Sequence, residues 1–233
     1  MTATLARRMS QGLMHELERL GRACSPEGMG TSQRRRDHLR AELKFLRDPF
    51  ESLEALIDEY AVTWPLDGQG AGLRDCQGFL AWLNATQSLT PRQQDCVVCQ
   101  RSWFMVEEQI QQSYTAHLRF QQQCAVGKWL IERPDREVDR QIYLNPIRIW
   151  ARFTTFALLD GAAQPPANVL FFGGGDQSRA VLFELEGQAL LNELVDYQPA
   201  CIREWTQMTR LAYGPDLDEF CRDLARLGLV ALA

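Results

Sequence analysis

Cys96 and Cys99 form a CxxC pair, a spacing at which two thiols bind a metal ion or exchange electrons. A structural zinc site needs four ligands, and neither a second CxxC nor a pair of closely spaced histidines accompanies this one. On a helix the two thiols share a face with Trp103, an arrangement that also suits a hydrophobic core. The pair therefore has two open interpretations, core packing and a redox or metal role.

The three histidines, His15, His38 and His117, fall in three separate predicted helices. No two of them lie at ligand spacing on one helix, so we expect surface positions for all three and no metal site. The sequence also lacks a GxSxG-type motif that would anchor Ser/His/Asp catalysis. These observations predict a chain without catalytic residues and without a cofactor of its own.

Charge and composition argue against several classes of function. The 233 residues are 45% hydrophobic and 24% charged, with a net charge of −5, which is typical of a folded protein and unsuited to broad nucleic-acid binding. No run approaches the roughly 18 consecutive apolar residues of a membrane span, and Glu16 and Glu18 interrupt any signal-peptide core. We therefore expect a cytoplasmic protein with reduced cysteines and no membrane or nucleic-acid partner. The basic run Arg34–Arg36 is either a solvated helix face or a surface that docks on an acidic partner.

The first part of the chain repeats apolar residues at three- and four-residue steps, which predicts helices. Thr90-Pro91-Arg92-Gln93 gives the clearest start signal, with a capping hydroxyl, a proline at the first helical position and a glutamine three residues after the cap. From there one long helix is expected to reach Cys124. The helices are expected at about 3–23, 31–46, 50–62, 73–86 and 90–124.

After Arg140 the pattern changes to strand-like runs and then to three short helices. The runs lie at 141–144, 147–156, 168–172 and 179–185, and the helices at about 187–196, 199–213 and 216–227. The GGGD run at 173–176 is expected to be a hairpin turn, because a phosphate-binding loop needs a helix and not a strand after its glycines. The fold class is therefore α+β, with an all-α helical domain at 1–140 and a winged-helix-like β-β-β-α-α-α module at 141–233.

The charge of this last module favours a peptide ligand over DNA. From Ile147 to Ala233 it holds seven arginines and no lysine against eleven acidic residues, whereas a DNA-reading helix and wing are basic. A winged helix also leaves a strand edge beside its last helix. Such an edge accepts a peptide as an added strand, with main-chain hydrogen bonds for affinity and apolar pockets for selection.

Two runs in the module resemble the RiPP recognition element, a domain of the pyrroloquinoline-quinone peptide-chaperone type that binds ribosomally made precursor peptides. They are VLFELEGQALLNELVD at 181–196 and DEFCRDLARLGLV at 218–230. In that family a strand ending in leucine enters a helix of small and aliphatic residues, and the last helix closes in a Leu-x-x-x-Gly-like ending. Tyr197 departs from the glycine that the family usually has after the aspartate.

A helical domain followed by such an element is similar to the accessory subunits of multinuclear non-haem iron oxidases, as in methanobactin and 3-thiaglutamate biosynthesis. The resemblance implies a heterodimer with a separate TIM-barrel enzyme, which carries the iron and modifies a peptide cysteine. It implies that this chain captures the precursor peptide and presents it to that enzyme. No cofactor is then expected in this chain, and no catalysis by the chain alone.

The peptide is expected to lie antiparallel to Arg179–Leu185, in a groove walled by the last helix. Arg179 and Leu182 belong to the strand that the peptide would join. The apolar pockets would come from residues that could equally be plain core, namely Val181, Phe183, Phe220, Leu224 and Leu227. Asp223 and Arg226, on the flank of the last helix, would make selective contacts with charges of the peptide.

Two alternatives from other classes remain. One is a stand-alone metal or thiol redox enzyme that uses Cys96, Cys99 and the histidines. The other is a transcriptional regulator with an acidic winged helix and a helical dimerisation domain. Stoichiometric iron or zinc in the purified chain would favour the first, and salt-dependent DNA binding would favour the second.

Overall fold

The computed structural model of the chain describes residues 6–7, 31–64, 72–131, 141–155, 167–175, 177–197, 199–201, 204–205 and 215–232. The chain forms two compact units, and it passes between them at 8/9, 105/106, 150/151 and 167/168. The helical unit comprises 9–105 and 151–167, and the sheet unit comprises 1–8, 106–150 and 168–233. The expected boundary between Arg140 and Gln141 is not one of these divisions, so the independent folding of 141–233 stays a prediction.

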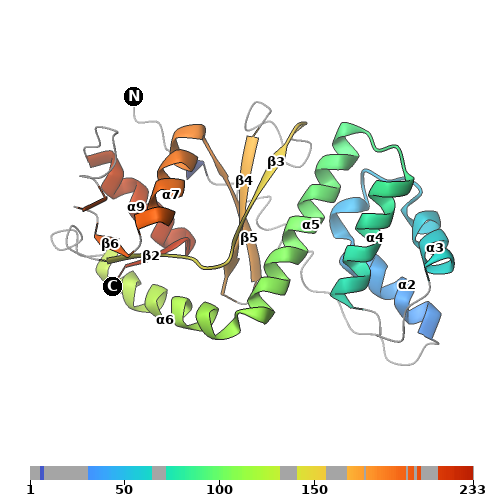
Figure 1. The fold of residues 1–233 in the computed structure, drawn as a ribbon, viewed down its shortest axis with the longest axis horizontal. Helices are drawn as coiled ribbons and strands as arrows, with labels where there is room; N and C mark the ends of the chain where they lie inside the picture. The colour runs from blue at the N-terminus through green and yellow to red at the C-terminus, as the bar shows by residue number, and fades with distance from the viewer. Residues whose placement is uncertain are drawn as a thin grey trace. The chain divides into compact units, whose positions relative to one another are not determined.

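Helices surround one hydrophobic core in the helical unit (Figure 1). They are α2 (Thr31–Glu42), the short 3-10 helix η1 (Lys44–Leu46), α3 (Leu53–Thr63), α4 (Leu73–Thr86) and the first part of α5 (Pro91–Gln112). The core gathers the apolar residues that recur at helical spacing, including Leu39, Leu43, Leu46, Ile57, Phe79, Leu80, Leu83 and Val97. The helices expected at 50–62 and 73–86 are confirmed, apart from shifts at the ends of the first. The helix expected at 31–46 ends earlier, at Glu42, and the separate 3-10 helix η1 follows it.

The start of α5 follows the capping signal in the sequence. The Thr90 backbone N–H donates to Gln93 Oε1 at 3.0 Å, and the Gln93 N–H donates to Thr90 Oγ1 at 3.3 Å. The expected continuation to Cys124 as one helix is wrong. A turn at Ser113 ends α5, and a second helix, α6 (Tyr114–Ile131), begins one residue later.

The described strands form two sheets. The first has the strand order β1-β5-β4-β3, formed by Ala6–Arg7, Gln177–Phe183, Ala167–Gly174 and Arg148–Phe153 respectively. The second has the order β6-β2-β7, formed by Ala200–Cys201, Gln141–Leu144 and Val230–Leu232. Helices α7 (Leu185–Tyr197) and α9 (Pro215–Leu227) complete the described elements (Figure 1).

Strand β1 corrects the helix expected at 3–23. Ala6 and Arg7 are extended and pair antiparallel with β5, with Ala6 opposite Phe183 and Arg7 opposite Leu182. The rest of that expected helix, His15 included, lies outside the described residues. The helical spacing of apolar residues around Ala6 and Arg7 therefore did not determine their conformation. Pairing with β5, which is distant in sequence, determined it.

The fold class is mixed α+β, as expected, and β2 has the predicted bounds Gln141–Leu144. The middle of the three expected helices, 199–213, lies mostly outside the described residues, although Glu204 and Trp205 are helical. Strands β6 and β7 were not expected, and they place β2 at the centre of its own sheet. The winged-helix arrangement of the module consequently stays a proposal.

Close backbone contacts hold α6 and α9 against the second sheet. A Cβ atom at Gly127 of α6 would lie 2.9 Å from the carbonyl oxygen of Leu232, so only glycine fits this approach of helix to strand. Helix α9 ends at Gly228, where φ is +80°, and the Leu229 N–H donates to the Leu224 carbonyl at 2.8 Å. This Schellman-type ending turns the chain directly into β7.

Candidate functional site

Strand β5 is the centre of the expected peptide site. One of its edges is paired along its whole length with β4, from Asn168 opposite Phe183 to Gly174 opposite Gln177. Its bounds, Gln177–Phe183, move the expected strand 179–185 two residues toward the hairpin turn. The residue that follows the strand, Glu184, is exposed, and Leu185 already begins α7.

The other edge of β5 carries β1, which sequence reasoning missed. Arg7 lies opposite Leu182 and Ala6 opposite Phe183, so the pairing covers the last two residues of β5. In the part of the chain that the structure describes, no strand pairs with 177–181 along this edge. Two residues are too short a segment to give a periodic signal, so only the structure could reveal the pairing.

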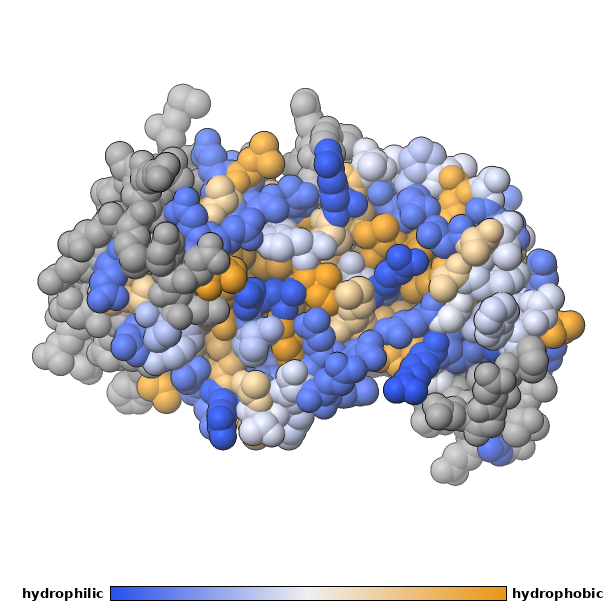
Figure 2. Space-filling view, in the orientation of Figure 1, coloured by the Kyte–Doolittle hydropathy of each residue, from blue (hydrophilic) through white to orange (hydrophobic). Residues whose placement is uncertain are grey.

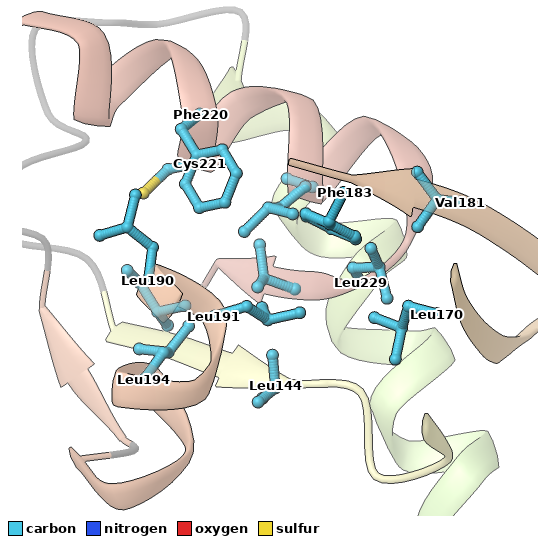
Figure 3. Close-up of a cluster of buried hydrophobic side chains, with 14 of the residues drawn as sticks. Leu144, Leu170, Val181, Phe183, Leu190, Leu191, Leu194, Phe220, Cys221 and Leu229 are labelled. Carbon is cyan, nitrogen blue, oxygen red and sulfur yellow. The ribbon is translucent and has the colours of Figure 1, made fainter. Parts of the chain in front are cut away.

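Most of the expected pocket residues belong to the hydrophobic core of the sheet unit. Val181, Phe183, Phe220 and Leu224 are at most 4% exposed and pack with one another and with residues of β2, α7 and β7. Figure 3 shows the side chains from β5, α7 and α9 pointing toward a common centre. Of the two interpretations of these four residues, the structure supports the core.

Aromatic rings fix the environment of Phe183. Its ring lies edge-on to Trp150, with centroids 5.5 Å apart, and edge-on to Phe220 at 6.4 Å. Leu227 is half-buried against the same cluster. Leu182 is also buried but points to the opposite face of the sheet, since side chains alternate along a strand. The space around Phe183 is therefore already filled by side chains of this chain.

The charged candidates on α9 lie at the surface. Arg226 Nη1 donates to Asp223 Oδ1 at 3.0 Å, and the Arg226 side chain is 52% exposed. An exposed pair of this kind contributes little to stability. The Asp223 side chain is 22% exposed, so Arg226 is the more accessible of the two groups. Arg179 of β5 is half-buried, and its side chain lies over Gly174, where a Cβ atom would come within 2.3 Å of Arg179 Cδ.

The glycine run forms the expected hairpin turn, but Gly173 and Gly174 still belong to β4. Gly174 pairs with Gln177, and Gly175 has a φ of +70° in the turn. Gly173 is needed for a different reason, because a Cβ atom there would lie 2.9 Å from Cε1 of His117. Asp176 lies outside the described residues.

His117 holds this hairpin to α6. Its Nε2 lies 2.6 Å from the Gly175 carbonyl oxygen, and since a carbonyl only accepts, Nε2 carries the proton. The expectation of a surface position is wrong for His117, which is 4% exposed. Asn145 secures the other side of the hairpin, donating from Nδ2 to the carbonyl oxygens of Gly173 at 2.7 Å and Gly228 at 3.0 Å.

The CxxC pair lies in the core of the helical unit. Cys96 and Cys99 are buried free thiols. Burial raises the pKa of Cys96 to about 11 and raises the pKa of Cys99 well above its usual value. A thiol that stays protonated is a poor nucleophile and a poor metal ligand, so the geometry favours core packing. Among the described residues, no group of three or more His, Cys, Asp or Glu side chains is placed to hold a metal ion.

The basic run of α2 is mostly engaged within the helical unit. Arg34 is exposed, but Arg35 is buried and forms an ion pair with Asp75, and Arg36 Nε contacts Asp58 Oδ1 at 2.8 Å. The interpretation of Arg34–Arg36 as a solvated helix face is therefore wrong at Arg35. A docking surface made of all three arginines is excluded for the same reason.

Comparison with protein-family models, with curated proteins and with solved structures finds no match to this chain. None of the helices that the structure describes is both long enough and apolar enough to cross a membrane. On the face drawn in Figure 2, hydrophobic residues show in small areas that hydrophilic residues separate. A function can be argued from the β5 edge, because this edge pairs with β1.

Proposed function

We propose that this chain is a non-catalytic accessory subunit that captures a ribosomally made precursor peptide by strand addition at β5. It would present the peptide to a partner enzyme of the TIM-barrel, multinuclear iron type, with which it forms a heterodimer in the cytoplasm. The observation that carries the proposal is the pairing of Ala6 and Arg7 with Leu182 and Phe183. This edge already accepts, antiparallel, a strand from a distant part of the sequence.

Main-chain hydrogen bonds would supply most of the affinity. The side chains of Val181 and Phe183 are buried in the core, so they form no open pockets for a bound peptide. Their packing instead holds the backbone of β5 in place. Affinity in strand addition comes from the ladder between the two backbones, and this requires a rigid acceptor. The full pairing of β5 with β4 and the packing of its inward face supply that rigidity.

Selection between peptides would come from accessible side chains of α9 and β5. The exposed Asp223–Arg226 pair on α9 is one such feature, and the half-buried Arg179 on β5 is another. Asp223 and Arg226 keep the role that the sequence analysis expected of them, whereas the selective role of Arg179 is added here. Val181, Phe183, Phe220 and Leu224 support the strand from beneath in this proposal.

The iron and the oxidation chemistry belong to the partner enzyme in this proposal, and they rest on the resemblance to RiPP accessory subunits. The helical unit contributes buried, protonated thiols at Cys96 and Cys99, which suit a scaffold. A chain of this kind acts by holding the peptide near the partner, which raises the local concentration of the reacting cysteine.

The test is a titration of the full chain with labelled synthetic peptides that are encoded beside its gene, followed by fluorescence anisotropy. We expect one of them to bind and a scrambled peptide of equal charge not to bind. Binding by none of these peptides would refute the proposal.

Two neighbouring proline variants place the binding on β5. In an antiparallel strand, successive backbone N–H groups point to opposite edges, so only one of Val181→Pro and Leu182→Pro removes a donor from the peptide edge. That variant should keep the β4 pairing and lose the peptide. Val181→Ile and Leu182→Met retain the N–H and should bind as the unmodified chain does.

A further inference from the structure

Strand β1 lies on the edge that the proposed function assigns to the peptide. It takes the two positions opposite Leu182 and Phe183 and leaves 177–181 without a strand partner among the described residues. An incoming peptide that pairs along the whole of β5 must therefore displace β1. Resting on the proposed function, we infer that β1 is a tethered competitor that closes the peptide site and sets the register of its ligand.

The size of β1 suits a competitor that can be displaced. Two residue pairs supply only a few main-chain hydrogen bonds, each of small net strength in water. A peptide that pairs with all of Gln177–Phe183 gains more of these bonds than β1 loses. No described strand pairs with 177–181 on this edge, and this stretch gives such a peptide a place to begin pairing before β1 leaves.

The tether makes the competition effective in spite of the short strand. Because β1 belongs to the same chain, its pairing is intramolecular and does not depend on protein concentration. The apparent Kd of a peptide rises by the inverse of the fraction of open sites. If β1 occupied the edge nine-tenths of the time, the apparent Kd would be about tenfold above that of an open edge.

The register of β1 also indicates the class of ligand. The residue opposite Phe183 is an alanine, and the ring of Phe183 is already packed against Trp150 and Phe220, so a small residue suits this position. The next residue, opposite Leu182, is an arginine. Glu184, two residues beyond Leu182, is exposed. A long basic side chain of a bound peptide, placed opposite Leu182, would lie within diagonal reach of this carboxylate. The ligand is therefore an extended segment with a small residue followed by a basic one.

The first experiment empties the edge. Ala6→Pro/Arg7→Pro removes both N–H donors of β1, whereas the matched control Ala6→Ser/Arg7→Lys keeps them. The probe is a labelled synthetic peptide of residues 1–12 of this chain, and a second peptide with the same two prolines is its control. The proline variant should bind the probe about tenfold more tightly than the matched control. Equal affinity of the two variants would overturn the inference.

A reversible lock covers the case in which the proline variant folds poorly. Cross-strand partners lie within disulfide distance, so Arg7→Cys/Leu182→Cys is expected to bridge β1 and β5 when oxidised. The oxidised chain should lose the probe peptide, and reduction of the same sample should restore binding. Binding that survives oxidation would contradict the inference, and recovery on reduction shows that the fold is intact.

Competition between two peptides separates the inference from the proposed function. If the probe binds the open edge as expected but no peptide encoded beside the gene displaces it, the competitor role stands and the capture of a precursor fails. If a gene-encoded peptide binds equally well to the open, control and oxidised forms, capture stands and the competitor role fails.

Discussion

Arg35 and Asp75 form a bidentate ion pair in the helical unit, with Nε to Oδ2 at 2.9 Å and Nη2 to Oδ1 at 2.8 Å. Both side chains are at most 4% exposed. Arg35 also donates to the carbonyl oxygens of Ala61 and Trp64, and its guanidinium lies 4.8 Å from the centroid of the Tyr60 ring. One buried arginine thus links α2, α3 and α4.

Asp75→Asn should destabilise the chain strongly, because it leaves the Arg35 charge buried without a counter-charge. Breaking a buried pair in this way typically costs about 3–5 kcal/mol of unfolding free energy. Asp58→Asn is the matched control, since Asp58 pairs with Arg36 at the surface and is expected to change stability by less than about 1 kcal/mol. Urea unfolding measures both, and equal effects of the two variants would show that the buried pair has no special role.

This ion pair also shows where sequence reasoning stops. The pattern of α2 gave the correct helix and the correct apolar face, because both depend on residues three and four apart. It did not distinguish Arg35 from its neighbours, because its partner Asp75 is 40 residues away on another helix. Whether a charged side chain is buried depends on such distant partners, and a local run of charged residues does not predict them.

Gly173→Ala tests the contact between the hairpin and α6. The added Cβ would meet His117 at 2.9 Å, and His117 is held by its bond to Gly175, so a loss of about 1–3 kcal/mol is expected. Gly174→Ala is the control, because the partly exposed Arg179 side chain can move away from the new methyl group.

The double variant Gly173→Ala/His117→Ala isolates the clash. Without the imidazole, the closest contact of the methyl group at 173 is removed and only the contact with Ile110 Cγ1 at 3.3 Å remains. The double variant should therefore be more stable than the sum of the two single effects predicts, by at least about 0.5 kcal/mol. Thermal or urea unfolding of the four proteins completes the cycle. Strictly additive effects would mean that the requirement for glycine at 173 does not come from the His117 side chain.

The raised thiol pKa values predict a loss of stability in alkali. Folded Cys96 stays protonated up to about pH 11, whereas an unfolded thiol ionises near pH 8.5 to 9. The protonated thiol therefore makes its full contribution to the free energy of unfolding below the pKa of the unfolded chain. As pH rises from about 9 to about 11, the free energy of unfolding falls by up to about 1.4 kcal/mol per pH unit for each thiol. Cys99 shifts in the same direction. Unfolding of the chain and of Cys96→Ala/Cys99→Ala between pH 7 and 11 should show a shallower decline in the variant.

Asp223→Ala and Arg226→Ala should separate binding from folding. The pair is exposed on α9, so each substitution is expected to change the unfolding free energy by less than about 0.5 kcal/mol. If the pair contacts charges of a bound peptide, one or both variants should raise the Kd several-fold, and more so at low salt. Unchanged affinity in both variants would remove this flank from the site.

The candidate site was predictable in part. The β4–β5 hairpin follows from two strand-like runs around a glycine turn, and the start of α5 follows from its capping residues. Strand β1 and the division of the core residues from the accessible ones were not predictable. Ala6 and Arg7 pair with β5, which is far away in sequence. The sequence pattern around Phe183 is the same whether its side chain fills a core or lines a groove.

Residue-resolved hydrogen exchange of the full chain, with and without a gene-encoded peptide, tests the central claim most directly. The amides of β5 that face β4 are already bonded, so a strand added at the other edge should protect only the alternate amides of Gln177–Phe183. We predict that protection rises at these positions and that the one amide of Ala6 and Arg7 that faces β5 loses its protection as β1 is displaced. Binding without any change in β5, or with protection confined to the helical unit, would contradict the account.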